Sequence, residues 1–109
     1  MDYQAINDKI NALKSQGIVK PHIGEAKEPV PVKIVSVNKH AMKHGVTLDE
    51  AQSFVDNAVV MFDQSNRSLY VSEDGNSVIL DAEKRLISAY RKEKFDSGIQ
   101  AILEVVNNG

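Results

Sequence analysis

Residues 58–90, AVVMFDQSNRSLYVSEDGNSVILDAEKRLISAY, decide the fold of this chain. Short runs of apolar residues, many of them branched or aromatic, alternate with short polar runs, and this spacing predicts strands rather than helices. We expect the strands at 58–62, 67–72, 77–81 and 85–90. Connections this short favour an antiparallel meander, and Asp74-Gly75 is typical of a type I′ hairpin turn.

Helical patterns lie on both sides of this meander. Residues 3–15 place apolar side chains at helical spacing, and Gly17 ends that helix. Thr47 and Glu50 form a capping box, which predicts a helix over 48–56. The residues after Asp96 carry apolar side chains at i, i+3, i+4 and i+7. The sequence therefore predicts an α+β fold, with N-terminal helices packed on one face of a four-stranded antiparallel meander sheet and a C-terminal helix.

The segment before the capped helix is less regular. The stretch KPHIGEAKEPVPVK, residues 20–33, contains every proline of the chain and predicts an extended connector. VKIVSV at 32–37 predicts a short strand, and NKHAMKHG at 38–45 predicts two helical turns ending at Gly45. We interpret residues 1–31 as an N-terminal helix with a proline-containing connector and residues 32–109 as the α+β domain. Whether the first helix is a satellite or packs on the domain stays open.

The composition excludes several classes of protein. The chain has 109 residues, of which 42% are hydrophobic and 26% charged, the balance of a single soluble globular domain. It has no cysteine, which excludes disulfides, thiolate zinc sites and thiol nucleophiles. We expect no membrane partner, because no apolar run has the length of a membrane span and the N-terminus lacks a signal-peptide pattern. The net charge of −2 argues against a dedicated duplex-DNA binder, but it allows a cleft with local positive charge.

The stretch HAMKHGVTLDE, residues 40–50, contains two of the chain's three histidines. His40 and His44 share one face if the segment is helical. They suit a metal site, acid–base catalysis or plain surface decoration, and the spacing alone favours the last. A metalloprotease motif needs glutamate after its first histidine, where this chain has Ala41, so no metal or other cofactor is predicted. The side-chain pKa of histidine ordinarily lies near neutral pH, so a histidine with a lysine beside it suits proton transfer at a phosphate.

The strand expected at 85–90 carries a second group of polar side chains. Alternation places Arg85, Ile87 and Ala89 on one face and Leu86, Ser88 and Tyr90 on the other. Ile87 and Ala89 suit a core beneath a helix. Ser88 and Tyr90 are therefore expected on the open face of the sheet, with Lys92 just beyond the end of the strand.

The strand expected at 67–72 adds to that open face. Leu69 and Val71 are expected to point inward, and Ser68, Tyr70 and Ser72 outward. An open face with tyrosines, hydroxyls and basic groups at its ends could hold a phosphate and stack a base. Exposed strands favour tyrosine and serine in any case, so a purely structural interpretation stays open.

The order of these motifs resembles a family of nucleases. His-Ala-x-Lys-His-Gly-Val-Thr at 40–47, a capped helix, a meander and LISAY at 86–90 together resemble the barnase/EndoU/colicin/RelE superfamily of RNases. The resemblance is closest to toxin-like nuclease domains of phage minor head proteins. KHGVTLDEA at 43–51, followed by RLISAY, is also similar to the BrnT toxins of the same superfamily. The resemblance covers about residues 33–106, so it implies that residues 32–109 form an RNase-like domain.

The resemblance implies a metal-independent endoribonuclease. In that superfamily the ribose 2′-hydroxyl attacks the adjacent phosphate and leaves a cyclic phosphate end. Carried over by position, the catalytic histidine is His40, with His44 as the second candidate, and Ser88 and Tyr90 match the hydroxyl and tyrosine of the last strand. The side chains expected to contact the substrate are Lys43, Arg67, Tyr70 and Lys92.

We therefore expect a phage- or prophage-derived domain that cleaves RNA such as tRNA in the cytoplasm or travels with the virion. A toxin of this kind would have an inhibitor or antitoxin protein as its partner. One alternative is a non-catalytic phage structural or interaction module whose N-terminal helix docks on a partner. Another is a BrnT-like toxin of a toxin–antitoxin pair. The oligomeric state, and the assignment of base and acid between the histidines, stay open.

Overall fold

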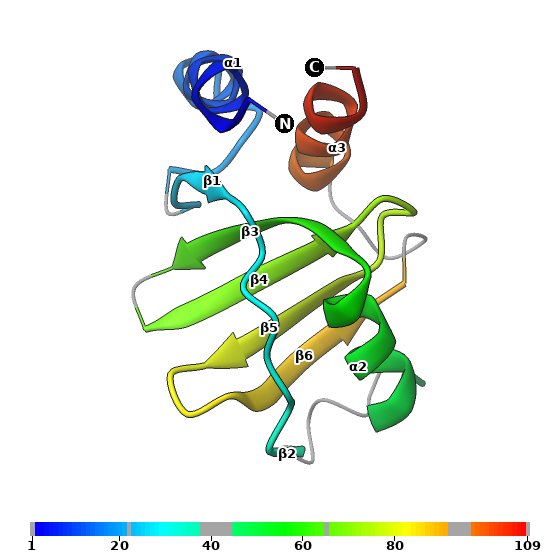
Figure 1. The fold of residues 1–109 in the computed structure, drawn as a ribbon. Helices are drawn as coiled ribbons and strands as arrows, with labels where there is room; N and C mark the ends of the chain where they lie inside the picture. Colours follow the sequence, from blue (N-terminus) through cyan, green and yellow to red (C-terminus); the bar gives the residue numbers. More distant parts are fainter. Residues whose placement is uncertain (1, 22, 38–44, 65, 92–96, 109) are drawn as a thin grey trace.

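The computed structural model describes residues 2–21, 23–37, 45–64, 66–91 and 97–108 of the chain. These residues form an α+β fold, which confirms the predicted class (Figure 1). The helices are α1 (Tyr3–Ser15), α2 (Leu48–Asp56) and α3 (Ser97–Asn108). The strands are β1 (Ala26–Lys27), β2 (Ser36–Val37), β3 (Ala58–Gln64), β4 (Arg67–Ser72), β5 (Ser77–Asp81) and β6 (Arg85–Tyr90).

The sheet is larger than the predicted meander. Its order is β1-β3-β4-β5-β6-β2, and the four central strands form the expected antiparallel meander. β1 adds an antiparallel edge beside β3, and β2 adds a parallel edge beside β6. The prediction of four strands, all antiparallel, is therefore wrong in these two respects. Each edge strand has only two residues, too few for a recognisable alternation of apolar and polar side chains.

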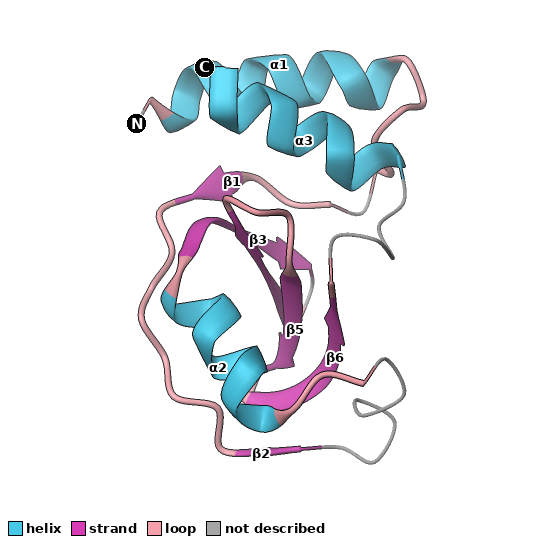
Figure 2. Cartoon of the chain, turned by 90° about the vertical axis from the view of Figure 1, so that its right-hand side faces the viewer, coloured by secondary structure: helices cyan, strands magenta, loops and turns pink. Residues whose placement is uncertain are grey.

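Helices cover both faces of the sheet, not one as predicted. The sheet curves around α2, while α1 and α3 lie together on its other side (Figure 2). The reason is that the central strands are apolar on both faces. In β3, Val60 and Phe62 pack with α1 and α3, whereas Met61 packs with α2. Each face must be buried, and each acquires its own helical cover.

Local signals explain the helix boundaries. The Asp2 side chain accepts a hydrogen bond from the Ala5 backbone N–H at 3.1 Å and caps α1, and Gly17 takes a positive φ of 76° just after it. The capping box of Thr47 and Glu50 is present at the start of α2, as predicted. The two helical turns predicted at 38–45 lie outside the described residues, except for Gly45.

The first 31 residues contribute to the same core as the rest of the chain. Ile6 and Ile10 of α1 are buried against α3, β3 and β4. The side-chain amide of Asn7 accepts from the Ala26 N–H at 2.7 Å and donates to the Ala26 carbonyl at 2.9 Å, so α1 also holds the outer edge of β1. The predicted boundary at residue 31, between the N-terminal helix with its connector and the α+β domain, stays a prediction.

The predicted hairpin turn at Asp74-Gly75 connects β4 and β5, but it is not of the predicted type. A type I′ turn requires positive φ at both central residues. Gly75 has φ of 93°, but Asp74 does not share the positive sign. The connection between β4 and β5 is a longer loop in which the Gly75 N–H donates to the Ser72 carbonyl at 3.0 Å. The expectation of a type I′ turn at Asp74-Gly75 is therefore wrong.

The turn between β5 and β6 has a lysine where the other turn has glycine. Lys84 adopts φ of 67°, a left-handed conformation that costs a non-glycine residue about 1 kcal/mol. We expect Lys84→Gly to raise the free energy of unfolding by about 0.5–1 kcal/mol, measured by urea denaturation. Lys84→Ala is the control, because alanine keeps the Cβ and should bring no gain. An equal gain in both variants would contradict this explanation.

Candidate functional site

Ser88 and Tyr90 lie on one face of β6. In the register of β5 and β6, Ser88 is opposite Ile79 and Tyr90 is opposite Ser77. Ala89, between them, is buried with the side chains of α2. Because successive side chains point to opposite faces, Ser88 and Tyr90 point away from α2. Both are half-buried, so this face of β6 is only partly covered.

The remainder of β6 does not follow the predicted alternation. Leu86 was expected on the face of Ser88 and Tyr90, but it is fully buried in the core beneath α2. The pairing passes from Ile79 opposite Ser88 to Leu80 opposite Leu86, which leaves Ile87 as an extra residue. Such a β-bulge reverses the alternation on one side of it. The expectation for Leu86 is therefore wrong, and the bulge is the cause.

The predicted orientation of Tyr70 is also wrong. Tyr70 is only 1% exposed and packs in the core beneath α2 instead of pointing to an open face. Its hydroxyl donates to the Val30 carbonyl at 3.1 Å, so the proline-containing connector provides the partner that a buried phenol requires. Burial, and to a lesser extent the charge of Asp63, raises the pKa of Tyr70.

Arg67 is exposed, but the structure does not bring it to Ser88 and Tyr90. It lies at the start of β4 opposite Asp81, whereas Tyr90 lies opposite Ser77 at the other end of β5. Ser77 and Asp81 are four residue steps apart along β5, a distance of about 13 Å. Arg67 is thus at one end of the sheet and Tyr90 at the other.

His40, Lys43, His44 and Lys92 lie outside the described residues, but the described ends of the histidine-containing segment can be placed. Val37, before it, pairs with Leu86 in β6. Gly45, after it, accepts a hydrogen bond from the Arg91 guanidinium at 3.2 Å, just beyond the end of β6. Both ends are therefore fixed along the strand that carries Ser88 and Tyr90.

Arg91 belongs to a network that the sequence analysis did not identify. Its Nη2 also donates to Glu50 Oε2 at 2.5 Å. Glu50 Oε1 in turn accepts from the Thr47 N–H at 3.3 Å, and the Glu50 N–H donates to Thr47 Oγ1 at 3.1 Å. The capping-box glutamate thus links the start of α2 to the end of β6. The hydrogen bond from Arg91 is the main cause that lowers the pKa of Glu50.

This network predicts an acid-sensitive contribution to stability. Because the pKa of Glu50 is lower in the folded protein, its contribution is present above the unfolded-state pKa of about 4.3 and is lost as pH falls through the folded value. We expect Glu50→Gln to lower the melting temperature at neutral pH. We expect the melting temperatures of the variant and the wild type to converge in acid, once Glu50 is protonated in the folded protein. Asp49→Asn, in the same helical turn but outside this network, is the control. A constant difference between wild type and Glu50→Gln across this pH range would contradict the linkage.

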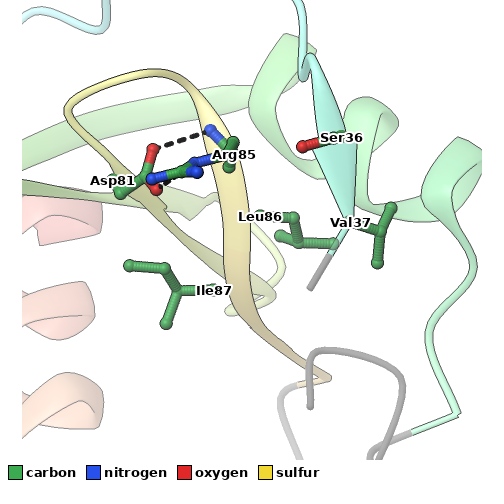
Figure 3. A pocket seen from close by; sticks show the side chains of 6 residues that line it. All are labelled: Ser36, Val37, Asp81, Arg85, Leu86 and Ile87. Carbon is green, nitrogen blue, oxygen red and sulfur yellow. Dashed lines mark hydrogen bonds and ion pairs between the residues drawn. The ribbon is translucent and has the colours of Figure 1, made fainter. Parts of the chain in front are cut away.

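A pocket of about 350 Å³ lies at the other end of β6, beside β2. Figure 3 shows its lining, which consists of Ser36, Val37, Asp81, Arg85, Leu86 and Ile87. Arg85 Nε donates to Asp81 Oδ2 at 2.7 Å, and its Nη2 donates to Glu83 Oε2 at 3.2 Å. Two carboxylates therefore balance this guanidinium, which offers little net positive charge to a phosphate.

No protein-family model matches the chain, and neither a curated protein nor a solved structure matches it. Among the described residues, no group of three or more acidic side chains or histidines is placed to hold a metal ion. All three histidines lie outside those residues. None of the helices, over the same part of the chain, is long and apolar enough to cross a membrane.

Proposed function

We propose that the protein is a small phage-derived endoribonuclease that cleaves RNA such as tRNA without a metal ion. The observation that carries the proposal is the arrangement along β6. Ser88 and Tyr90 share one face of this strand. Val37 and Gly45, the described residues before and after the histidine-containing stretch of the sequence, contact Leu86 and Arg91 of the same chain region. The stretch of β6 between these anchor points is at most about 16 Å long.

The proposed reaction is an intramolecular transesterification. An imidazole removes the proton of the ribose 2′-hydroxyl, whose oxygen forms a bond to the adjacent phosphorus. The bond from phosphorus to the 5′-oxygen breaks, and that oxygen receives a proton from an acid, leaving a 2′,3′-cyclic phosphate and a 5′-hydroxyl. We assign the proton transfers to His40 and His44, which would contribute about 10²–10⁴-fold to the rate.

The hydroxyls of Ser88 and Tyr90 would donate to the phosphorane oxygens, where fixed donors are most effective. Lys43 and Lys92 would offset its charge. Arg67 lies at the other end of the sheet, so it could bind only a more distant part of the RNA. Tyr70 has no place in this site, because it is buried on the opposite face.

The test is incubation of the purified protein with total tRNA in EDTA, with analysis of the product ends. We expect cleavage with cyclic phosphate ends, a loss of about 10²-fold or more in His40→Ala, and a loss of about 10²-fold in Tyr90→Phe. Tyr3→Phe is the matched control, because its hydroxyl donates to the Val59 carbonyl at the α1 side of the sheet. Folded wild-type protein that leaves tRNA intact would refute the proposal.

A non-catalytic phage interaction module is the second candidate, and burial of the sheet favours it. Both faces of β3 and β4 are covered by helices, so a broad open face for RNA does not exist over those strands. If folded wild-type protein keeps α1 packed on the sheet and does not cleave tRNA, that result would support this second function. The first proposal includes the case in which the ribonuclease is a toxin with an inhibitor or antitoxin protein as its partner.

A further inference from the structure

We infer that residues 28–35, the strap, form a gate over the core beneath α2, which opens as one unit while the sheet stays folded, with the side-chain amide of Gln52 as its latch. The strap crosses the sheet from β1 to β2 on the side that carries α2 (Figure 1). The structure describes all of its residues. The inference is independent of the proposed ribonuclease activity.

The latch imitates a neighbouring strand. Gln52 Nε2 donates to the Val32 carbonyl, and Gln52 Oε1 accepts from the Ile34 N–H, both at 2.9 Å. In an extended chain these two backbone groups point to the same side, so one amide can bond both. Nε2 also donates to Asp56 Oδ1 at 2.9 Å, one helical turn later, which fixes the orientation of the amide. The latch is therefore already set on α2 before the strap closes.

Other hydrogen bonds hold the strap backbone only at its two ends. The Val30 carbonyl accepts from the Tyr70 hydroxyl at 3.1 Å, and the Val30 N–H donates to Met61 Sδ at 3.4 Å, where a thioether is a weak acceptor. The Val35 N–H donates to the Lys84 carbonyl at 3.0 Å, where the pairing with β6 begins. Within the described part of the chain, no backbone-to-backbone hydrogen bond joins residues 28–34 to the sheet.

The strap also buries little apolar surface. Ile34 is buried, whereas Val30 and Val35 are 57% and 71% exposed. Segments with few buried apolar contacts open at free energies below that of global unfolding. Pro29 and Pro31 have fixed φ and no N–H, so the strap is stiff and needs few partners. A stiff segment held mainly by one amide should open as a unit rather than residue by residue.

A second amide clarifies what is particular to Gln52. The side chain of Asn7 bonds both backbone groups of Ala26, at 2.7 and 2.9 Å. Ala26 belongs to β1 and is also paired with β3, so there the amide supplements strand pairing. At the strap, the amide of Gln52 takes the place of that pairing. Loss of Gln52 should therefore release the strap without opening the sheet.

Opening would change the access to the core beneath α2. Met61 and Tyr70 are 5% and 1% exposed in the closed structure, and both contact the strap through Val30. An open strap would uncover the Met61 thioether and free the Tyr70 hydroxyl. The gate thus controls whether a dissolved reagent, such as hydrogen peroxide, reaches Met61.

The experiment is native-state hydrogen exchange of the full chain by NMR, in increasing sub-denaturing urea, for wild type, Gln52→Leu and Gln4→Leu. In the wild type, the Ile34 and Val35 amides should exchange with little dependence on urea, whereas amides of β4 should show the steep dependence of global unfolding. Gln52→Leu should speed exchange at Ile34 and Val35 alike by about 10–100-fold, because the strap loses two hydrogen bonds. Oxidation of Met61 by hydrogen peroxide should become faster in the same variant.

Gln4→Leu is the matched control. The Gln4 amide also donates to an aspartate one turn later, Asp8 at 3.1 Å, but it lies on α1 and has no contact with the strap. Strap exchange in this variant should equal that of the wild type. Acceleration as large as in Gln52→Leu would overturn the assignment of the latch.

Each remaining outcome also decides the inference. An equally steep urea dependence for Ile34 and for β4 in the wild type would mean that the strap opens only when the whole protein unfolds, which would overturn the gate. Faster exchange at Ile34 alone would overturn the single unit, because the Val35 N–H bonds Lys84 and not Gln52. Unchanged oxidation of Met61 alongside faster strap exchange would show that opening does not uncover the core.

Discussion

Gly24→Ala is expected to lower the free energy of unfolding by about 3 kcal/mol, because there is no room for a side chain at this position. A Cβ on Gly24 would overlap the backbone carbonyl oxygen of Asp63 and stand 3.0 Å from its carbonyl carbon. Backbone atoms cannot turn aside as a flexible side chain does. The two strands must move apart near the β1–β3 pairing, which begins at Ala26 and Phe62.

The measurement is urea denaturation of wild type and Gly24→Ala, with Gly17→Ala as the matched control. Gly17 has φ of 76° but nothing within 4 Å of its added Cβ, so alanine there should cost only the backbone strain of about 1 kcal/mol. A clearly larger loss at Gly24 would show that contact, rather than loss of a glycine, is the cause. Equal losses in the two variants would contradict the close approach of Gly24 to Asp63.

Elements whose signals are local were predicted well from the sequence. The capping box at Thr47 and Glu50 places the start of α2 correctly, because a cap depends only on residues three positions apart. The four central strands were found because each has enough residues for its apolar pattern to be recognised. The two-residue edge strands depend instead on partners distant in the chain, which no local pattern reveals.

Which side of a strand is buried was harder to predict than the strand itself. The residues of β4 alternate as expected, but α1 and α3 cover one face and α2 covers the other, so alternation does not separate buried from exposed. In β6, the bulge at Ile87 moved Leu86 to the other face while Ser88 and Tyr90 kept a common one. The Arg91–Glu50 contact joins residues 41 positions apart, and no pattern in the sequence indicates it.

Tyr70 carries the second large expected effect, because its burial replaces a predicted role in substrate binding with a structural one. It is among the largest fully buried side chains, in contact with the core beneath α2. We expect Tyr70→Ala to lower the free energy of unfolding by about 3–5 kcal/mol, as for other large aromatic truncations. Tyr70→Phe should cost about 1 kcal/mol, because it loses only the hydrogen bond to the Val30 carbonyl.

Chemical denaturation of both variants, together with tRNA cleavage by Tyr70→Phe, separates the two roles. A structural Tyr70 predicts a graded loss of stability and an unchanged cleavage rate in the phenylalanine variant, since the ring still fills the same space. A substrate-binding Tyr70 predicts the reverse, with stability close to wild type even in Tyr70→Ala. That reverse pattern would require the phenol to point away from α2. The sheet would then have a broad exposed face for RNA, where the structure has helices covering both faces.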